Sequence, residues 1–198
     1  NEDWNLITRT IMPLINQPEF VPGQDSKFGL GDINLSLFVG PKEPGEVIWG
    51  CGPVFMFPTA TDDRLGTKKW GAGPAAVVLT MQGPWVFGGL AQNLWSFAGD
   101  SDRADVNQML FQYFINYNLP DGWYLSTSPI ITANWKADND NRWVIPFGGG
   151  IGRMNFLGKL PLNTSAHAYY NVERPDDFGP RWTLRVQVQT LLPKSLFQ

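Results

Sequence analysis

The fold is decided by residues 106–136, which read VNQMLFQYFINYNLPDGWYLSTSPIITANWK. Two runs of alternating apolar and polar residues flank the segment Leu119-Pro120-Asp121-Gly122, whose Pro and Gly favour a turn. Strict period two predicts strands with one apolar and one polar face, so the segment predicts a β-hairpin. Each run exceeds the usual five or six residues of a strand and approaches the roughly ten that a tilted strand needs to cross a bilayer. We therefore expect a membrane-spanning hairpin.

Composition favours a barrel over a soluble globule, although the length permits either. The 198 residues include nine Trp and 13 Phe, while only 17% are charged, against about 25% in ordinary soluble domains. No window approaches the roughly 18 uninterrupted apolar residues of a transmembrane helix. The mean hydropathy of -0.19 is compatible with a membrane barrel, because its strands alternate lipid-facing and lumen-facing residues.

Charge and the scarcity of Cys and His exclude several classes of site. The net charge of -3 and the absence of a basic, aromatic-rich patch give no reason to expect nucleic acid. With one cysteine, Cys51, and one histidine, His167, we expect no internal disulfide, no metal site and no cofactor. The opening NEDWNLITRT has neither an initiator Met nor an apolar signal region, which indicates a mature product or a fragment.

Alternating runs recur along the whole chain and predict an all-β, antiparallel up-and-down transmembrane barrel in a single domain, residues 1–198. We predict ten strands, near residues 4–15, 29–40, 46–58, 70–82, 85–97, 105–118, 123–136, 142–157, 163–173 and 181–193. Short links with Pro or Gly alternate with mostly longer, acidic links, as in outer-membrane barrels. An even strand number predicts that both ends of the chain lie on the same, periplasmic side.

The polar face of each strand is expected to point into the lumen, since charges toward lipid are costly. The alternation in the strands of residues 70–82 and 85–97 is too blurred by Ala and Gly to assign their faces. The expected lumen-lining residues are Arg9, Asp32, Asn34, Gln108, Gln112, Asn116, Asn134, Lys136, Arg153, Arg185, Gln187 and Gln189. They line a narrow pathway and filter charge, or they form a network that plugs a small barrel.

Tryptophans fall close to strand ends, where an indole can rest at the level of the lipid headgroups. An aromatic girdle is expected from Trp4, Trp49, Trp70, Trp85, Trp95, Trp123, Trp135, Trp143 and Trp182.

Arg153 conflicts with strict alternation, because counting from Trp143 places its guanidinium on the lipid face. A bulge among the glycines of residues 148–152 would reset the register, turning Arg153 and Asn155 into the lumen and Met154 and Phe156 to lipid. The alternative is that Arg153 already lies at the periplasmic interface and reaches the headgroups without a bulge.

His167 is the one residue that suggests catalysis, because it shares a strand face with Ser165, Tyr169 and Asn171. Residues two apart on one strand are roughly 7 Å apart, too far for the direct bond that a nucleophile and base require. We therefore predict no catalytic residues and no enzyme. The carboxylate pairs Asp62-Asp63 and Asp176-Asp177 are expected to be turn residues, with weak Ca²⁺ or lipopolysaccharide bridging as the minor alternative.

Several stretches resemble a known family: GLGD (29–32), LGTKKWGAGPA (65–75), GPWVFGGLAQNLWSFAGD (83–100), the hairpin above, WVIPFGGGIGR (143–153) and WTLRVQVQTLLPK (182–194). The chain is similar over essentially its whole length to bacterial outer-membrane barrels described as transporters of the meta-pathway of phenol degradation, some labelled neuromedin U. The resemblance implies an outer-membrane location and a barrel of up to twelve strands, of which this chain lacks an N-terminal hairpin.

These observations lead to three functional hypotheses. The first is an outer-membrane barrel in which a small, aromatic or apolar molecule crosses passively, with outer-membrane lipid and lipopolysaccharide as its surroundings. The second is a closed structural barrel whose loops bind a partner. The third is an outer-membrane barrel hydrolase that uses His167.

Overall fold

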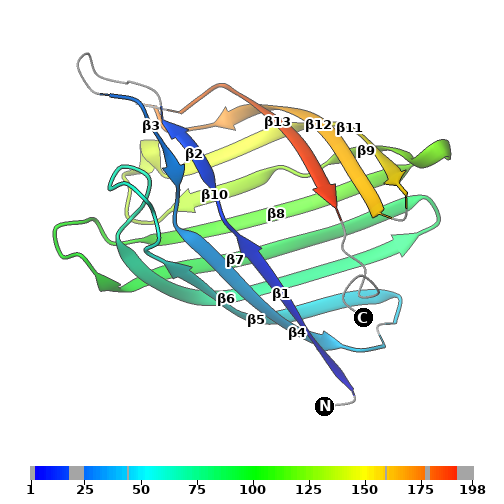
Figure 1. Ribbon diagram of the computed structural model, residues 1–198, viewed down its shortest axis with the longest axis horizontal. Coiled ribbons are helices and arrows are strands. Elements are labelled where there is room, and N and C mark those ends of the chain that lie inside the picture. Colours follow the sequence, from blue (N-terminus) through cyan, green and yellow to red (C-terminus); the bar gives the residue numbers. More distant parts are fainter. Residues whose placement is uncertain (1–2, 18–24, 44, 159, 177–178, 191–198) are drawn as a thin grey trace.

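The computed structural model describes residues 3–17, 25–43, 45–158, 160–176 and 179–190. Antiparallel strands curve into a barrel (Figure 1), and the helical elements are the short 3-10 turns η1 (Pro120–Gly122) and η2 (Asn139–Asn141). No helix in the described ranges is long and apolar enough to cross a membrane. The predicted all-β antiparallel barrel is confirmed.

The strands of the main sheet follow one another around the barrel in chain order. The bounds of the described strands are β1 Trp4–Ile11, β2 Leu14–Gln17, β3 Lys27–Leu30, β4 Ile33–Pro41, β5 Val47–Phe57, β6 Lys69–Gln82, β7 Trp85–Gly99, β8 Asn107–Asn118, β9 Trp123–Thr127, β10 Ile130–Asn134, β11 Trp143–Leu157, β12 Leu160–Glu173 and β13 Trp182–Thr190. The 11-stranded main sheet runs β1-β4-β5-β6-β7-β8-β10-β11-β12-β13, with β9 between β8 and β11. β2 and β3 form a separate two-stranded antiparallel sheet, called here the β2–β3 hairpin. Among the described residues no ladder joins β1 to β13, so these two strands flank the seam of the barrel.

β9 and β10 form a single crossing of the barrel. Both pair with β8 in one continuous register, with Ser126 opposite Asn116 and Ile130 opposite Gln112. Ser128 and Pro129 interrupt the strand between them, because proline has no N–H to donate to a ladder. The 11 strands therefore make ten crossings.

The two ends of the barrel differ in their connections. The short links after β4, β6, β8 and β11 share one end, called here the turn end, and the longer links share the other, the loop end (Figure 1). β1 starts at the turn end, where Trp4 pairs with Pro41, and β13 finishes there, where Thr190 pairs with Leu162. The first and last strands thus have the relative orientation that an even number of crossings requires.

The outward face of the sheet is apolar. Alternation is clear even in β6 and β7, where buried Ala75 and Leu90 point inward while exposed Ala76 and Ala91 point outward. Exposed apolar side chains of the outward face include Leu6, Val39, Val47, Val78, Phe111, Leu125, Phe147, Ile151, Leu184, Val186 and Val188. A water-soluble protein rarely exposes so continuous an apolar surface.

Tryptophans form two belts at the edges of this apolar surface. The turn-end belt contains Trp4, Trp49, Trp85 and Trp123, in which Trp4 meets Trp49 edge to face at 6.2 Å. The loop-end belt contains Trp70, Trp95, Trp135, Trp143 and Trp182, in which Trp135 meets Trp143 at 5.5 Å. Most of these indoles are about half exposed, so they are not core residues.

The bulge predicted between Gly148 and Gly152 is wrong. β11 pairs with β12 in unbroken register from Pro146 to Leu157, and the irregularity lies between Ile145 and Pro146. Arg153 pairs with Trp123 and its guanidinium lies 5.1 Å from the centre of that indole, on the outward face. Met154, expected toward lipid, lines an internal cavity. No reset is needed, because Arg153 lies near the turn end beside a belt tryptophan, where a guanidinium can reach water.

Candidate functional site

The interior of the barrel is divided by a cluster of apolar side chains. Leucines 90 and 94 of β7 pack with Phe38, Val54 and Met56, all at most 7% exposed, and with Ala75. All come from inward positions of β4 to β7, so they fill the lumen on that side. A cavity lies at either end of this apolar cluster.

The turn-end cavity has a volume of about 620 Å³. Its apolar lining residues include Leu90, Phe114 and Met154. The polar side chains that line it are Arg9, Gln112, Asn116, Asn118, Tyr124, Ser126, Ser128, Asn163, Ser165, His167, Gln187 and Gln189. The cavity is therefore amphipathic, and none of these lining residues is an Asp or a Glu.

Glycines on β11 let side chains from neighbouring strands meet across it. Ser126 pairs with Gly150, which in turn pairs with His167, and the Ser126 Oγ lies 2.7 Å from the His167 Nε2. One row along, the Tyr124 ring lies where a Cβ on Gly152 would be, and its hydroxyl donates to Asn163 Oδ1 at 2.8 Å. The glycines that suggested a bulge instead leave room for these inward side chains.

Arg185 holds a second polar cluster next to His167, its register partner. Its Nη2 donates to the Ser128 carbonyl at 2.9 Å, to the Ser128 hydroxyl and to the Tyr169 hydroxyl at 2.7 Å. The guanidinium also lies 5.0 Å from the centre of the Tyr169 ring, which stacks on His167. This network ties the interruption between β9 and β10 to β12 and β13 beside the cavity.

Ser126 and His167 have the spacing of a nucleophile and a general base. His167 is only 6% exposed, and its Nδ1 is buried without a hydrogen-bond partner among the described residues. A catalytic pair also needs a third group that orients the base. Among the described residues, no carboxylate or other acceptor is bonded to the His167 Nδ1 to orient the imidazole.

The loop-end cavity, of about 500 Å³, has a different electrostatic character. It is lined by Thr67, Arg103, Asp105, Gln108 and Asn134, among others. Arg103 donates to the carbonyls of Asp63 and Gly66, and the Lys69 Nζ lies 3.2 Å from Asp105 Oδ1. The lining at this end thus carries charges of both signs, Arg103 together with Asp102 and Asp105.

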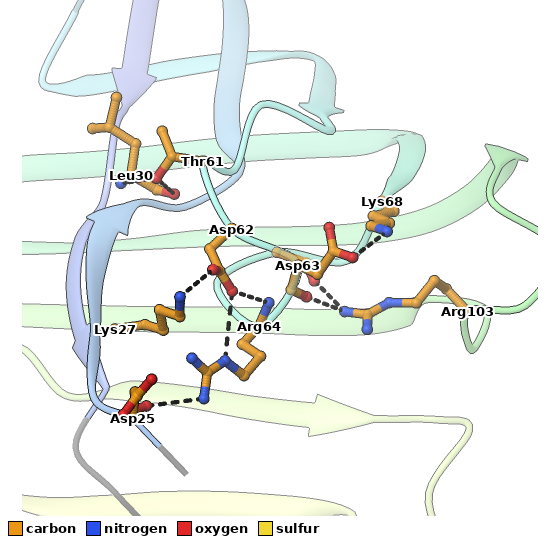
Figure 2. Close-up of polar contacts among 10 residues, drawn as sticks. Asp25, Lys27, Leu30, Thr61, Asp62, Asp63, Arg64, Lys68 and Arg103 are labelled. Carbon is orange, nitrogen blue, oxygen red and sulfur yellow. Dashed lines mark hydrogen bonds and ion pairs between the residues drawn. The ribbon is translucent and has the colours of Figure 1, made fainter.

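Loops around this cavity are joined by ion pairs, which Figure 2 shows. Asp62 lies 3.3 Å from the Lys27 ammonium and 3.5 Å from Arg64, and Lys68 lies 2.6 Å from Asp63. The Arg64 backbone N–H and the Lys27 ammonium hold the pKa of Asp62 below its usual value. The Asp63 carboxylate raises the pKa of Lys68, and Lys69 lowers the pKa of Asp105. The link between β5 and β6 is thereby fixed to the β2–β3 hairpin and to the link after β7.

The structure distributes the expected lumen residues among three places. Arg9, Gln112, Asn116, Gln187 and Gln189 line the turn-end cavity, whereas Gln108 and Asn134 line the loop-end cavity. Asp32, Asn34 and Arg185 lie on inward positions outside both cavities; Asp32 accepts from the Thr67 backbone N–H at 2.6 Å.

Two residues that were expected to line the lumen do not do so. Arg153 faces outward, as described above. Lys136 does not lie on a strand face, because β10 ends at Asn134, and its exposed side chain belongs to the following turn.

Sequence reasoning missed Ser126 as the partner of His167. The alternation within a strand identifies neighbours on that strand only, whereas this contact crosses an intervening strand. An inward-facing glycine on that intervening strand is the feature of the sequence from which the contact could have been predicted.

No protein-family model, no curated protein and no solved structure matches this chain.

Proposed function

We propose that this protein is a bacterial outer-membrane barrel through which small molecules with an aromatic or apolar body cross passively. The observation that carries the proposal is the continuous apolar outward surface bounded by two tryptophan belts. This arrangement is typical of transmembrane barrels, whose lipid-facing band lies between aromatic girdles. The resemblance to outer-membrane transporter-like barrels supports the same location, with lipid and lipopolysaccharide as the surroundings.

The interior supports passage of molecules rather than of hydrated ions. Cavities of about 620 Å³ and 500 Å³ lie on either side of the apolar cluster. A hydrophobic constriction gates by dewetting and so opposes hydrated inorganic ions, which have no apolar part that can pack against it. A solute with an apolar body meets a smaller barrier there, provided that side chains such as Leu94 and Met56 change rotamer.

The test is swelling of protein-containing liposomes in an isotonic solution of phenylalanine, a small aromatic solute that crosses lipid slowly. We expect the wild-type protein to increase the swelling rate and Leu94→Ala, which removes part of the apolar cluster, to increase it further. The control is Leu184→Ala, which truncates an outward side chain on β13 and should leave the rate unchanged. Swelling no faster than in empty liposomes for all three proteins would refute passage.

A closed structural barrel is the competing function, and the packing of Phe38, Val54 and Leu90 favours it. In that case the charged loop end would bind a partner. The same experiment separates the two functions, since a closed barrel predicts no swelling with either the wild type or Leu94→Ala.

A hydrolase is the third candidate, favoured by the 2.7 Å contact between Ser126 and His167. Hydrolysis of a short-chain nitrophenyl ester that is lost in Ser126→Ala and in His167→Gln would establish it. Equal, background rates for the wild type and both variants are the outcome that passive passage predicts.

A further inference from the structure

Charged side chains are distributed unevenly between the two internal cavities. At the loop end, Lys69 is paired with Asp105, and Asp32 accepts hydrogen bonds from Thr67. At the turn end, Arg9 is the charged side chain of the cavity, with no acidic lining residue to balance it. Arg185, behind the same wall, also has no carboxylate within ion-pair distance in the described part of the chain.

Arg9 has unused hydrogen-bonding capacity. Its guanidinium makes no hydrogen bond or ion pair with any other described residue. It projects from β1 on the inward side, opposite buried Ser36. A cation in the interior of a barrel is stabilised less by water than one at the surface, so an anion that enters the cavity relieves part of this cost.

Three neutral side chains of the same cavity also have free donors. Asn116 of β8 and Gln187 and Gln189 of β13 make no side-chain hydrogen bond within the described residues. With Arg9 they present amide and guanidinium N–H groups to one volume. A carboxylate fits this set, because guanidinium binds its two oxygens in a fork and amides can donate to the remaining lone pairs.

The same cavity also has apolar lining residues. Leu90, Phe114 and Met154 line the cavity and carry no hydrogen-bonding side-chain groups of appreciable strength. A volume of about 620 Å³ lies within the roughly 300–1,000 Å³ range of pockets that hold small molecules. One cavity therefore offers a guanidinium, amide donors and apolar side chains to the same ligand.

We propose that the turn-end cavity is a binding site for a small amphipathic anion, whose carboxylate binds Arg9 and whose apolar body packs on Leu90, Phe114 and Met154. This deepens the proposed function, on which it rests, by naming the class of molecule that enters the lumen. It narrows the proposed cargo, molecules with an aromatic or apolar body, to those that carry a carboxylate.

The test compares four probes by isothermal titration calorimetry with the refolded full chain in detergent micelles. Benzoate, benzyl alcohol and benzylamine share a ring and differ in charge, while acetate is a carboxylate without the ring. We expect benzoate to bind at least tenfold more tightly than each of the other three. Arg9→Gln should reduce benzoate binding to the level of benzyl alcohol, whereas the control Arg153→Gln, an outward arginine at the same end, should bind benzoate like the wild type.

Three results would overturn the site: equal binding of benzoate, benzyl alcohol and benzylamine to the wild type, benzoate binding that survives Arg9→Gln, or no detectable binding of any of the four probes. Because the wild-type comparison needs no variant, misfolding of Arg9→Gln would not remove the test. Binding is measured in micelles and passage in liposomes, so a selective site without swelling would refute the channel alone, and swelling without selectivity would refute the site alone.

Discussion

The hydroxyl of Ser126 and the imidazole of His167 lie 2.7 Å apart across Gly150, although 41 residues separate them in the chain. The glycine on the strand between them makes this contact possible. The same geometry recurs where Tyr124 covers Gly152. Inward glycines of β11 thus determine how the polar wall of the turn-end cavity is built.

Gly150→Ala is expected to break this contact. A Cβ at position 150 would meet the Ala166 carbonyl and lie 2.6 Å from the His167 Cα, so β12 must shift. We expect a loss of about 1–3 kcal/mol in the free energy of unfolding, the usual cost of overpacking, measured by urea titration of the protein in vesicles.

The control is Gly89→Ala on β7, where the nearest atom to an added Cβ is 3.7 Å away. It should change the free energy of unfolding by less than Gly150→Ala does. Equal effects of the two substitutions would show that the glycines of β11 have no special role in packing.

Charge on the outward face should impair membrane insertion. Phe111 and Ile131 are register partners on neighbouring strands, whereas Gln112 lines the turn-end cavity. We expect Phe111→Arg and Ile131→Arg each to cost about 2–4 kcal/mol near the bilayer midplane and Gln112→Arg to cost much less. The measurement is the equilibrium of folding into lipid vesicles, and equal tolerance of all three substitutions would contradict a lipid-facing outer surface.

Much of the fold was accessible from the sequence, because period-two alternation and the links determine strand number and facing. The interruption at Pro129 was hidden, since the residues on both sides keep the same alternation. The apolar cluster was missed because Ala and Gly blur the faces of β6 and β7. The contact of Ser126 with His167 and the outward position of Arg153 depend on neighbouring strands, and a single strand's pattern carries no information about them.

Acid is expected to destabilise the loops at the loop end. The pKa values of Asp62 and Asp105 are lower in the folded protein than in the unfolded chain. Their contribution to stability is therefore present above the unfolded-state pKa, about 3.9, and is lost as the pH falls through the folded-state pKa. Hydrogen exchange in residues 58–68 should therefore accelerate, beyond the intrinsic pH dependence, below about pH 4.

The matched variant for the acid experiment is Asp62→Asn, in which exchange in this loop should already be fast at pH 7 and less sensitive to acid. The pKa of Lys68 is raised in the folded protein. Its contribution to stability is therefore present below the unfolded-state pKa, about 10.4, and is lost as the pH rises above that pKa. Exchange protection of this loop that is the same at pH 3 and pH 7 would contradict the role of the carboxylates.

Arg185→Gln should destabilise the wall behind the cavity. The substitution removes the Nη2 hydrogen bonds to Ser128 and Tyr169 and should cost about 2 kcal/mol, within the range of hydrogen bonds made by charged groups. Arg181→Gln, at an exposed position just before β13, is the control. A urea midpoint that moves equally in both variants would argue against the network.

Cys51 offers the most direct test of a membrane-spanning barrel. This exposed cysteine lies on the outward face of β5, between the register partners Val39 and Ala76. Vesicles carrying the protein are frozen and thawed with a charged, membrane-impermeant thiol reagent so that both surfaces meet it, with Cys51→Ser/Asp138→Cys as the water-exposed control. We predict that Asp138→Cys reacts fully while native Cys51 reacts only after unfolding in detergent; rapid labelling of Cys51 in intact vesicles would contradict the account.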